Sequence, residues 1–414
     1  MFPILANAAG ALPHIDGYVY PNEQNLLWSV LIVVYPYITG LVAGAFIMAS
    51  FVRVFNVKAL EPVYRMSLLT ALAFLLAAPL PLLFHLGHPE RCMEMMLTPH
   101  LTSPMAMFGF VYAWYLMAVL LLELWLDYRH DFVQWSQQHT GFKRFLYNTF
   151  TVGVRDVSPA ALKLDHKMSL AISIIGIPSA FLLHGYVGFI FGSVKANVWW
   201  GNVLMPIIFI LSAMVSGMAL CVVLYMFITK VRGEKLDIKC LDVMGQMLFY
   251  ALVADAAIEA LDWIHRLYSA HEEIHVLKQL ASGKLFYTLL ILQALLGTLV
   301  PLVFLGLGQV FPKKISAAAR TRIYGVMAAL ILIGVAAMRW NVVIGGQLFS
   351  KSLRGFTTYK MGMAGHEGWP VAALLVALPF AILFVLVKLF LPQNPPESMS
   401  PAPSIAPATP APAS

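Results

Sequence analysis

Residues 26–52 read LLWSVLIVVYPYITGLVAGAFIMASFV, an apolar run without a single charged side chain. A helix crosses the hydrocarbon core of a bilayer with about 20 consecutive apolar residues, so this run is long enough to do so. The rest of the chain shares the bias: 60% of its 414 residues are hydrophobic and 11% are charged, whereas soluble domains carry about 25% charged residues. This fraction of charged residues is too low to cover a water-exposed surface. We therefore expect a membrane protein.

Further apolar runs follow the first, and together they predict about nine transmembrane helices. Backbone polar groups find no water in hydrocarbon, so each span must be a helix or a barrel strand. Uninterrupted runs of this length exclude the alternating pattern of barrel strands. We therefore expect an all-α, polytopic membrane protein. The predicted spans are Leu26–Val52, Val63–Leu86, Pro104–Leu126, His166–Phe191, Trp200–Thr229, Leu241–Leu267, Lys284–Phe311, Ile323–Val343 and Pro370–Leu391.

The basic residues of the loops predict the orientation. Roughly two thirds of the 27 Lys and Arg residues fall in loops on one side of this topology, which the positive-inside rule makes the cytoplasmic side. Arg339 is counted with the smaller set on the outer side. The N-terminal segment 1–25 has no Lys or Arg, so it lacks the charged region of a cleavable signal peptide. We expect a bacterial inner-membrane protein with its N-terminus outside and its C-terminus in the cytoplasm. The excess of Lys and Arg over Asp and Glu then reflects the membrane topology, and nucleic-acid binding is the weaker explanation of it.

The sixth predicted span carries three carboxylates in the stretch YALVADAAIEALDWIHRL. Asp255, Glu259 and Asp262 lie within roughly 60° of one another around a helix, and Arg266 continues the same stripe. Charged groups at such depth usually face a bundle interior or a water-filled path. Three acids on one face favour proton handling; the alternative is a stripe that neighbours neutralise for structural reasons alone.

The second predicted span ends in FHLGHPERCMEMM. His85 and His88 are three residues apart, which predicts that they share a helix face before Pro89 ends the helix. Glu90 and Arg91 follow at once. This set could bind a polar headgroup and titrate near neutral pH, or it could be a polar helix terminus at the level of the lipid headgroups.

The fourth predicted span contains His184 in FLLHGYVGF. A single membrane histidine can form a helix–helix hydrogen bond, bind a quinone, or bind haem together with a partner at matching depth, for which His85 and His265 are candidates. The predicted topology places His184, His85 and Asp262 in the outer half of the membrane. Cysteines cannot supply an iron–sulfur cluster here, because Cys92, Cys221 and Cys240 fall short of the usual four thiolates.

Three of these stretches carry a resemblance to a known family. The turn HLGHPER, the first-helix sequence PYITGLVAGAF and the fourth-helix sequence FLLHG resemble the NrfD/PsrC family, the membrane subunits of polysulfide reductases and related complexes. The resemblance covers most of Leu26–Val343. Within the family the chain is most similar to the Qrc-type menaquinone reductase subunits and the DsrP-type subunits.

The resemblance implies a function and a set of partners. Such subunits place two four-helix bundles side by side and carry no haem or iron–sulfur cluster of their own. They bind menaquinone or another quinone near the outer face, beside a ferredoxin-like iron–sulfur subunit. Further periplasmic redox subunits, a multihaem cytochrome c or a molybdopterin-family protein, complete such complexes. Carried over to this sequence, the quinone-binding residues are His184, His85, Asp262, Arg91 and His88, and the proton path is Asp255, Glu259, Asp262 and Glu90; no metal ligands are expected.

The sequence also divides the chain into segments. They are an outer N-terminal segment (1–25), a first four-helix bundle (26–192) with a cytoplasmic amphipathic connection (127–165), a second four-helix bundle (200–343), an outer loop with a ninth helix (344–391), and a disordered Pro/Ala/Ser tail (392–414).

Two other functions remain open from the sequence. The acidic stripe could line the substrate path of a secondary transporter or an ion channel, or the histidines could bind haem b in a cytochrome subunit. A transporter would be favoured by broken helices near the midplane, and the sequence indicates none flanking Asp255.

Overall fold

The computed structural model describes residues 15–98, 102, 109, 111–269, 274–363 and 365–391. The predicted disordered tail, most of the N-terminal segment and part of the third predicted span lie outside these residues.

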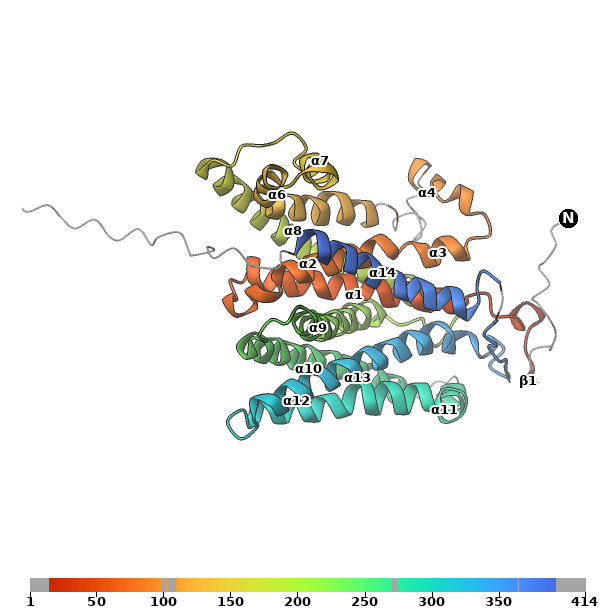
Figure 1. The fold of residues 1–414 in the computed structure, drawn as a ribbon. Coiled ribbons are helices and arrows are strands. Elements are labelled where there is room, and N and C mark those ends of the chain that lie inside the picture. Colours follow the sequence, from red (N-terminus) through yellow and green to blue (C-terminus); the bar gives the residue numbers. More distant parts are fainter. Residues whose placement is uncertain are drawn as a thin grey trace, which may run out of the picture.

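The described residues contain nine helices that are long and apolar enough to cross a membrane, which confirms the predicted all-α fold. They lie side by side with their axes roughly aligned (Figure 1). In chain order they are α1 (Val30–Arg53), α2 (Glu61–Ala77) with α3 (Leu80–His85), η4 (Trp114–Leu121) with α6 (Leu122–Gln138), α8 (Pro159–Gly192), α9 (Met205–Arg232), α10 (Ile238–Ser269), η5 (Phe286–Leu299) with α12 (Val300–Val310), α13 (Ala317–Val343) and α14 (Trp369–Phe390). The short elements are β1 (Asp16–Gly17), η1 (Pro21–Glu23), η2 (Lys58–Leu60), η3 (Pro89–Arg91), α4 (Glu94–Leu97), α7 (Gly141–Phe150), α11 (Ile274–Ser282), η6 (Gly345–Gln347) and β2 (Gly355–Phe356).

The spanning helices form two groups that meet along α1 and α9. Helices α1, α2, η4 with α6, and α8 contact one another and form what we call the first bundle; α9, α10, η5 with α12, and α13 form the second bundle. Helix α1 packs along α9, and α8 packs there as well. The ninth span, α14, lies against α2 and α1 on the outside of the first bundle (Figure 1).

Glycines allow the helix backbones to touch where the bundles meet. A Cβ atom on Gly44 of α1 would lie 2.6 Å from the Cα atom of Gly217 on α9, so neither position has room for a side chain. Small residues at such crossings let helices pack closely in lipid, where the hydrophobic effect does not drive helix association. Gly297 of η5 and Gly334 of α13 make a similar approach in the second bundle.

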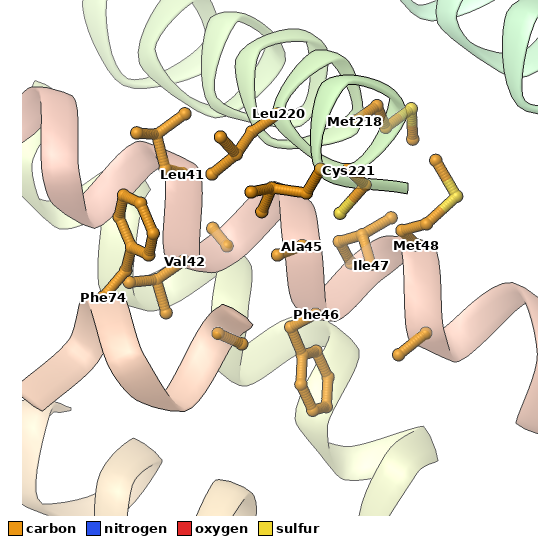
Figure 2. Close-up of a cluster of buried hydrophobic side chains, with 14 of the residues drawn as sticks. Leu41, Val42, Ala45, Phe46, Ile47, Met48, Phe74, Met218, Leu220 and Cys221 are labelled. Atoms are coloured by element: carbon orange, nitrogen blue, oxygen red, sulfur yellow. The ribbon is translucent and has the colours of Figure 1, made fainter. Parts of the chain in front are cut away.

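Apolar side chains fill the space around this crossing. Figure 2 shows Leu41, Val42 and Phe46 of α1 among side chains of α2 and α9. Phe46 is fully buried, and its ring would collide with a Cβ atom on Gly176 of α8. The core between the bundles is therefore tightly packed, as protein interiors usually are.

One end of the helix array is closed by the N-terminal segment and the predicted outer loop. Strand β1 pairs antiparallel with β2, and the two segments lie together at this end in Figure 1. The backbone N–H of Trp28 donates to Gln347 at 3.0 Å, and that of Val30 donates to the Tyr359 hydroxyl at 2.9 Å. We call this the outer end, and the opposite end, which holds the basic connections, the inner end.

Helix boundaries differ from the predicted ones in two places that matter for the site. Helix α3 ends at His85, and Leu86 is already extended (φ −66°, ψ 133°), so the prediction that His85 and His88 share a helix face was wrong. Gly87 is a poor helix former, and His88, which precedes Pro89, avoids the α-helical region of φ and ψ. The predicted amphipathic connection 127–165 consists of the end of α6, the short helix α7 and the start of α8.

Candidate functional site

The acidic stripe lies on one continuous helix. Helix α10 runs unbroken over Ile238–Ser269 and contacts α9, α12 and α13. Asp255 and Asp262 are buried, at 6% and 8% exposed, and Glu259 is half-buried. All three acids therefore face the second bundle's interior, as membrane-embedded acids usually do.

Asp262 is the outermost acid and is held by two residues. It accepts a hydrogen bond from the Asn202 side chain and another, at 2.9 Å, from Nε of Arg266 one turn along α10. Arg266 also donates to the carbonyl oxygens of Val198 and Trp199 at 2.8 and 3.2 Å. These bonds fix the outer part of α10 to the connection between α8 and α9.

Glu259 is held by one amide, which a second amide on another helix holds in turn. Gln293 of η5 donates to its Oε2 at 3.2 Å, and Asn341 of α13 donates to Gln293 Oε1 at 2.8 Å. Element η5 is π-helical, a form that often marks functional sites. No arginine or lysine forms an ion pair with Glu259 among the described residues, so this carboxyl bonds to the Gln293 amide alone.

Two voids follow the stripe inward. The first has a volume of about 60 Å³ and the second of about 10 Å³, and Glu259, Gln293 and Met338 line both. The larger cavity is lined by Trp199, Met205, Ile208, Glu259, Asp262, Trp263, Arg266, Leu289, Gln293, Met338, Asn341 and Val342. Asp255 lines the smaller void, and its Oδ1 has no hydrogen-bond partner among the described residues. A polar cavity of this size has room for water, so the three acids border one interrupted polar path.

A buried arginine of α13 lies outside the cavity, on the side of α8 and α9. Arg339 of α13 is 0% exposed, and its guanidinium lies 4.0 Å over the ring of Phe209. It donates to Ser212 at 2.7 Å and to Nε2 of His184 at 3.0 Å. Helix α13 therefore turns Asn341 toward the cavity and Arg339 away from it, toward α8 and α9.

These contacts define which ring nitrogen of His184 carries the proton. An arginine can only donate, so the Nε2 atom that faces Arg339 must be an acceptor and the proton must sit on Nδ1. Nδ1 lies 3.3 Å from the Thr39 hydroxyl, which in turn donates to the Tyr35 carbonyl oxygen at 3.0 Å. His184 is thus a neutral, fully bonded imidazole, and Gly40 leaves room for its ring, since a Cβ atom there would lie 3.2 Å from Cε1.

The histidine-rich turn lies elsewhere. Nδ1 of His85 is 2.6 Å from Glu367, just before α14, while His88 pairs with Glu90 at 2.9 Å and Arg91 pairs with Glu94 on the exposed surface. A backbone hydrogen bond and His88 hold the pKa of Glu90 below its usual value, so this carboxyl is ionised at neutral pH.

The structure brings only part of the predicted site together. Glu259 and Asp262 share the larger cavity with Arg266, whereas His184, His85, His88, Arg91 and Glu90 do not line it. Those five assignments stay predictions. Sequence reasoning missed Arg339, Gln293 and Asn341, although a signal existed: Arg339 and Gln293 are polar residues inside apolar spans, where such residues are rare. The count of Arg339 among the outer basic residues was wrong, because it lies within α13.

Sequence comparison supplies the family. The profile described as "Polysulphide reductase, NrfD" matches residues 19–351, which include the whole site and every spanning helix except α14. The chain belongs to the polysulphide reductase NrfD family. This confirms the predicted resemblance and a multi-pass membrane protein; the narrower likeness to Qrc-type or DsrP-type subunits stays a prediction.

Three curated relatives share parts of this sequence. The C subunit of selenate reductase from Mesobacillus selenatarsenatis is 30% identical over 328 residues, covering 77% of this chain and 73% of the relative. A putative dimethyl sulfoxide reductase membrane subunit from Halobacterium salinarum is 26% identical, covering 56% and 51%. Protein NrfD of Escherichia coli is 26% identical, covering 48% and 60%. Two of these names describe parts of reductases.

Proposed function

We propose that this chain is the quinone-interacting membrane subunit of a membrane-bound oxidoreductase complex, with menaquinone as its most suitable substrate. The observation that carries the proposal is the cavity at the outer part of the second bundle, in which Glu259 and Asp262 meet two tryptophans and Arg266. Relatives named as parts of reductases support a role within a larger complex.

The cavity offers what quinone chemistry needs from a protein. Interconversion of quinone and quinol moves two electrons and two protons, and carboxyl groups within hydrogen-bond reach can give or take those protons. Trp199 and Trp263 meet edge to face at 5.9 Å and border the cavity with apolar surface. In this role the quinone ring lies between them, with one carbonyl oxygen toward Asp262.

The cavity must open to admit the ring. Its volume of about 60 Å³ is well below the roughly 300 Å³ at which sites for small organic molecules begin. The two tryptophan side chains and Arg266 form its outer wall, so they are the groups that must move apart. A ring that enters there displaces the water of the cavity and comes within reach of both Asp262 and Glu259.

Protons then follow the stripe. Asp262 faces the ring, Glu259 lines both voids, and Asp255 ends the described path inside the smaller one. Quinone reduction draws protons outward, from Asp255 through Glu259 to Asp262, and quinol oxidation sends them inward in the reverse order. The same residues therefore serve both directions.

The electrons come from or go to another chain. We assign that role to a ferredoxin-like iron–sulfur subunit on the outer, periplasmic end, with further periplasmic redox subunits beyond it and the C-terminus in the cytoplasm of a bacterial inner membrane. Residues of the N-terminal segment and of the 344–368 connection pair with each other at that end, and we assign the docking surface to them. The chain itself supplies the quinone site and the proton path, and we assign it no haem or iron–sulfur cluster.

The other functions fit the geometry less well. Transporter sites are usually built from broken helices near the midplane, whereas α10 is continuous past all three acids. A haem iron at His184 would have to displace Arg339 or Thr39 from a ring nitrogen.

Replacement of Asp262 by Asn tests the proposal, because it keeps the shape and removes the titratable proton. We expect quinone-dependent turnover of the assembled complex to fall by about 100-fold or more, the usual contribution of a general acid or base. Asp242→Asn is the matched control: it changes an acid at the inner end of the same helix, which pairs with Arg320 at 3.0 Å. Normal turnover of Asp262→Asn in a complex that assembles would refute the site.

A further inference from the structure

The first bundle contains a buried carboxyl that the proposed quinone site does not use. Glu123 of α6 is 1% exposed. Its Oε1 accepts a hydrogen bond of 2.5 Å from Ser173 of α8, whereas its Oε2 has no partner among the described residues. Its titratable neighbours are Tyr64 of α2, Tyr115 of η4, Asp127 of α6 and Arg53 of α1, and the hydroxyls of both tyrosines are buried.

Four charged residues of α1, α2 and α6 pair with one another at the inner end of this bundle. Arg53 of α1 pairs with Asp127 at 2.9 Å, and Arg65 of α2 pairs with Asp127 at 3.3 Å and with Asp131 at 2.7 Å. Two arginines thus face two aspartates. We call these four residues the arginine–aspartate cluster. It leaves no positive charge over for a further carboxylate.

The histidine beside the cluster does not supply a charge either. Nδ1 of His166 lies 3.0 Å from a guanidinium nitrogen of Arg53. Because arginine only donates, this Nδ1 must accept, and His166 is neutral. An ionised Glu123 would therefore be an uncompensated charge in a buried, apolar interior, which costs far more than a neutral acid. The surroundings of Glu123 therefore favour the neutral, protonated acid.

A line of polar side chains leads from this carboxyl to the inner end. Along α8, His166, Ser169 and Ser173 are three and four residues apart, which places them on one helix face. Ser173 bonds to Glu123, Ser169 accepts from Nε of Arg53 at 3.1 Å, and His166 is exposed. Helices α6 and α8 contact each other, so this α8 ladder (His166, Ser169 and Ser173) lies between the buried acid and the inner end, and Arg53 bonds to both His166 and Ser169.

We propose that Glu123 is a second proton-binding site, which exchanges its proton with the inner aqueous phase along the α8 ladder. The step is a simple protonation: a proton from inner water adds to the carboxylate oxygen, and the same O–H bond breaks on release. It involves none of the acids on α10. The first bundle therefore holds one exchangeable proton close to the inner surface, independently of the quinone site.

An apolar carbodiimide tests the wild-type protein directly. Dicyclohexylcarbodiimide reacts with protonated carboxyls in apolar surroundings, so membranes that contain the full chain are treated at neutral pH and the modified peptides are identified by mass spectrometry. We expect modification of Glu123 and none of Glu61, an exposed carboxyl at the start of α2. If Asp255 were modified and Glu123 were not, the proposal would be overturned, because the reagent would have reached buried acids and still left Glu123 unreacted.

Infrared spectroscopy tests the exchange and its route. The purified full chain should show a carboxylic C=O band that shifts in D₂O and is absent from Glu123→Gln. Ser169→Ala and Ser173→Ala should keep the band and slow its shift by about 10-fold, the equivalent of one lost hydrogen bond. Ser67→Ala is the matched control, because Ser67 is a buried serine off the ladder that bonds to Cys221. Equal exchange rates in all three serine variants would refute the route, and an unchanged band in Glu123→Gln would refute the site; quinone turnover decides neither result.

Discussion

The arginine–aspartate cluster of the first bundle and the acidic stripe of the second hold their charges in opposite ways. In the cluster every carboxylate touches an arginine, and Asp127 touches two. In the stripe the pairing weakens with depth: Asp262 bonds to Arg266, Glu259 bonds only to an amide, and Asp255 has an oxygen without a described partner. The cluster thus holds each carboxylate in a direct ion pair, whereas the two deeper acids of the stripe have none among the described residues.

Arg339 makes the contrast clearer. It is the fully buried arginine of the second bundle, yet it bonds to His184, Ser212 and the Phe209 ring and not to a carboxylate. A positive charge that is near the stripe but not bonded to it lowers the cost of a negative charge there without fixing which acid carries it. A direct ion pair fixes the positions of its two side chains, whereas an arginine that is near the acids but not bonded to them leaves a proton free to move from one acid to another.

Loss of Asp127 should have the largest effect. Asp127→Ala leaves Arg53 and Arg65 in the half-buried interior with only Asp131 as an anion, and breaking a buried pair costs about 3–5 kcal/mol. We expect little full-length protein in the membrane and a lower temperature of thermal inactivation. Asp131→Ala removes an acid with a single arginine partner and should cost less. Equal accumulation of Asp127→Ala and wild type would show that the cluster is not structural.

His184→Ala should come next, and it should affect activity more than assembly. The substitution removes the acceptor of a buried arginine N–H, so Arg339 loses its position behind the cavity, and an unmatched buried donor costs about 1–3 kcal/mol. We expect an assembled complex whose quinone turnover falls by about 10- to 100-fold.

Thr39→Val is the control for this change. It removes only the contact at Nδ1 and leaves the bond between His184 and Arg339 intact, so turnover should fall less. A loss in Thr39→Val as large as that in His184→Ala would mean that the contact at Nδ1, and not the hold of His184 on Arg339, matters for turnover.

Asp255→Asn should have a smaller effect on one kinetic constant only. Asp255 lies outside the larger cavity, so quinone binding should be unchanged, while the supply of protons to Glu259 slows. We expect kcat to fall by about 10-fold with KM unchanged, which is the pattern for a group that acts after binding. A raised KM with normal kcat would place Asp255 at the quinone and not on the proton path.

The sequence predicted the parts of this molecule that local geometry determines. Span length follows from the thickness of the bilayer, so the nine helices were predictable, with boundaries off by some residues: α8 begins at Pro159 and not at His166. The shared face of Asp255 and Asp262 follows from the helical repeat. The same argument failed for His85 and His88, because the helix ends at His85, ahead of Gly87 and Pro89.

Contacts between helices were beyond reach of the sequence. The bonds from Gln293 to Glu259 and from Arg339 to His184 depend on how each helix is rotated about its axis. Those rotations are set by packing, for example by the glycine contact of η5 with α13, and no pattern within one helix contains that information. The positions of Arg339 and Gln293 inside predicted apolar spans were the available signal.

Arg91→Gln should have the smallest effect and separates the two parts of the predicted site. The sequence resemblance assigns Arg91 to quinone binding, whereas the structure places its side chain on the exposed surface, paired with Glu94 at 2.8 Å. Exposed ion pairs contribute little, so we expect KM for quinone to rise by about 2-fold at most, with kcat unchanged. Glu94→Gln breaks the same pair from the other side and is the matched control. If Arg91→Gln alone raised KM by about 10-fold or more, the arginine would contact quinone directly, and the HLGHPER turn would belong to the quinone site after all. Equal, small changes in both variants would leave the cavity of the second bundle as the place where the headgroup is bound.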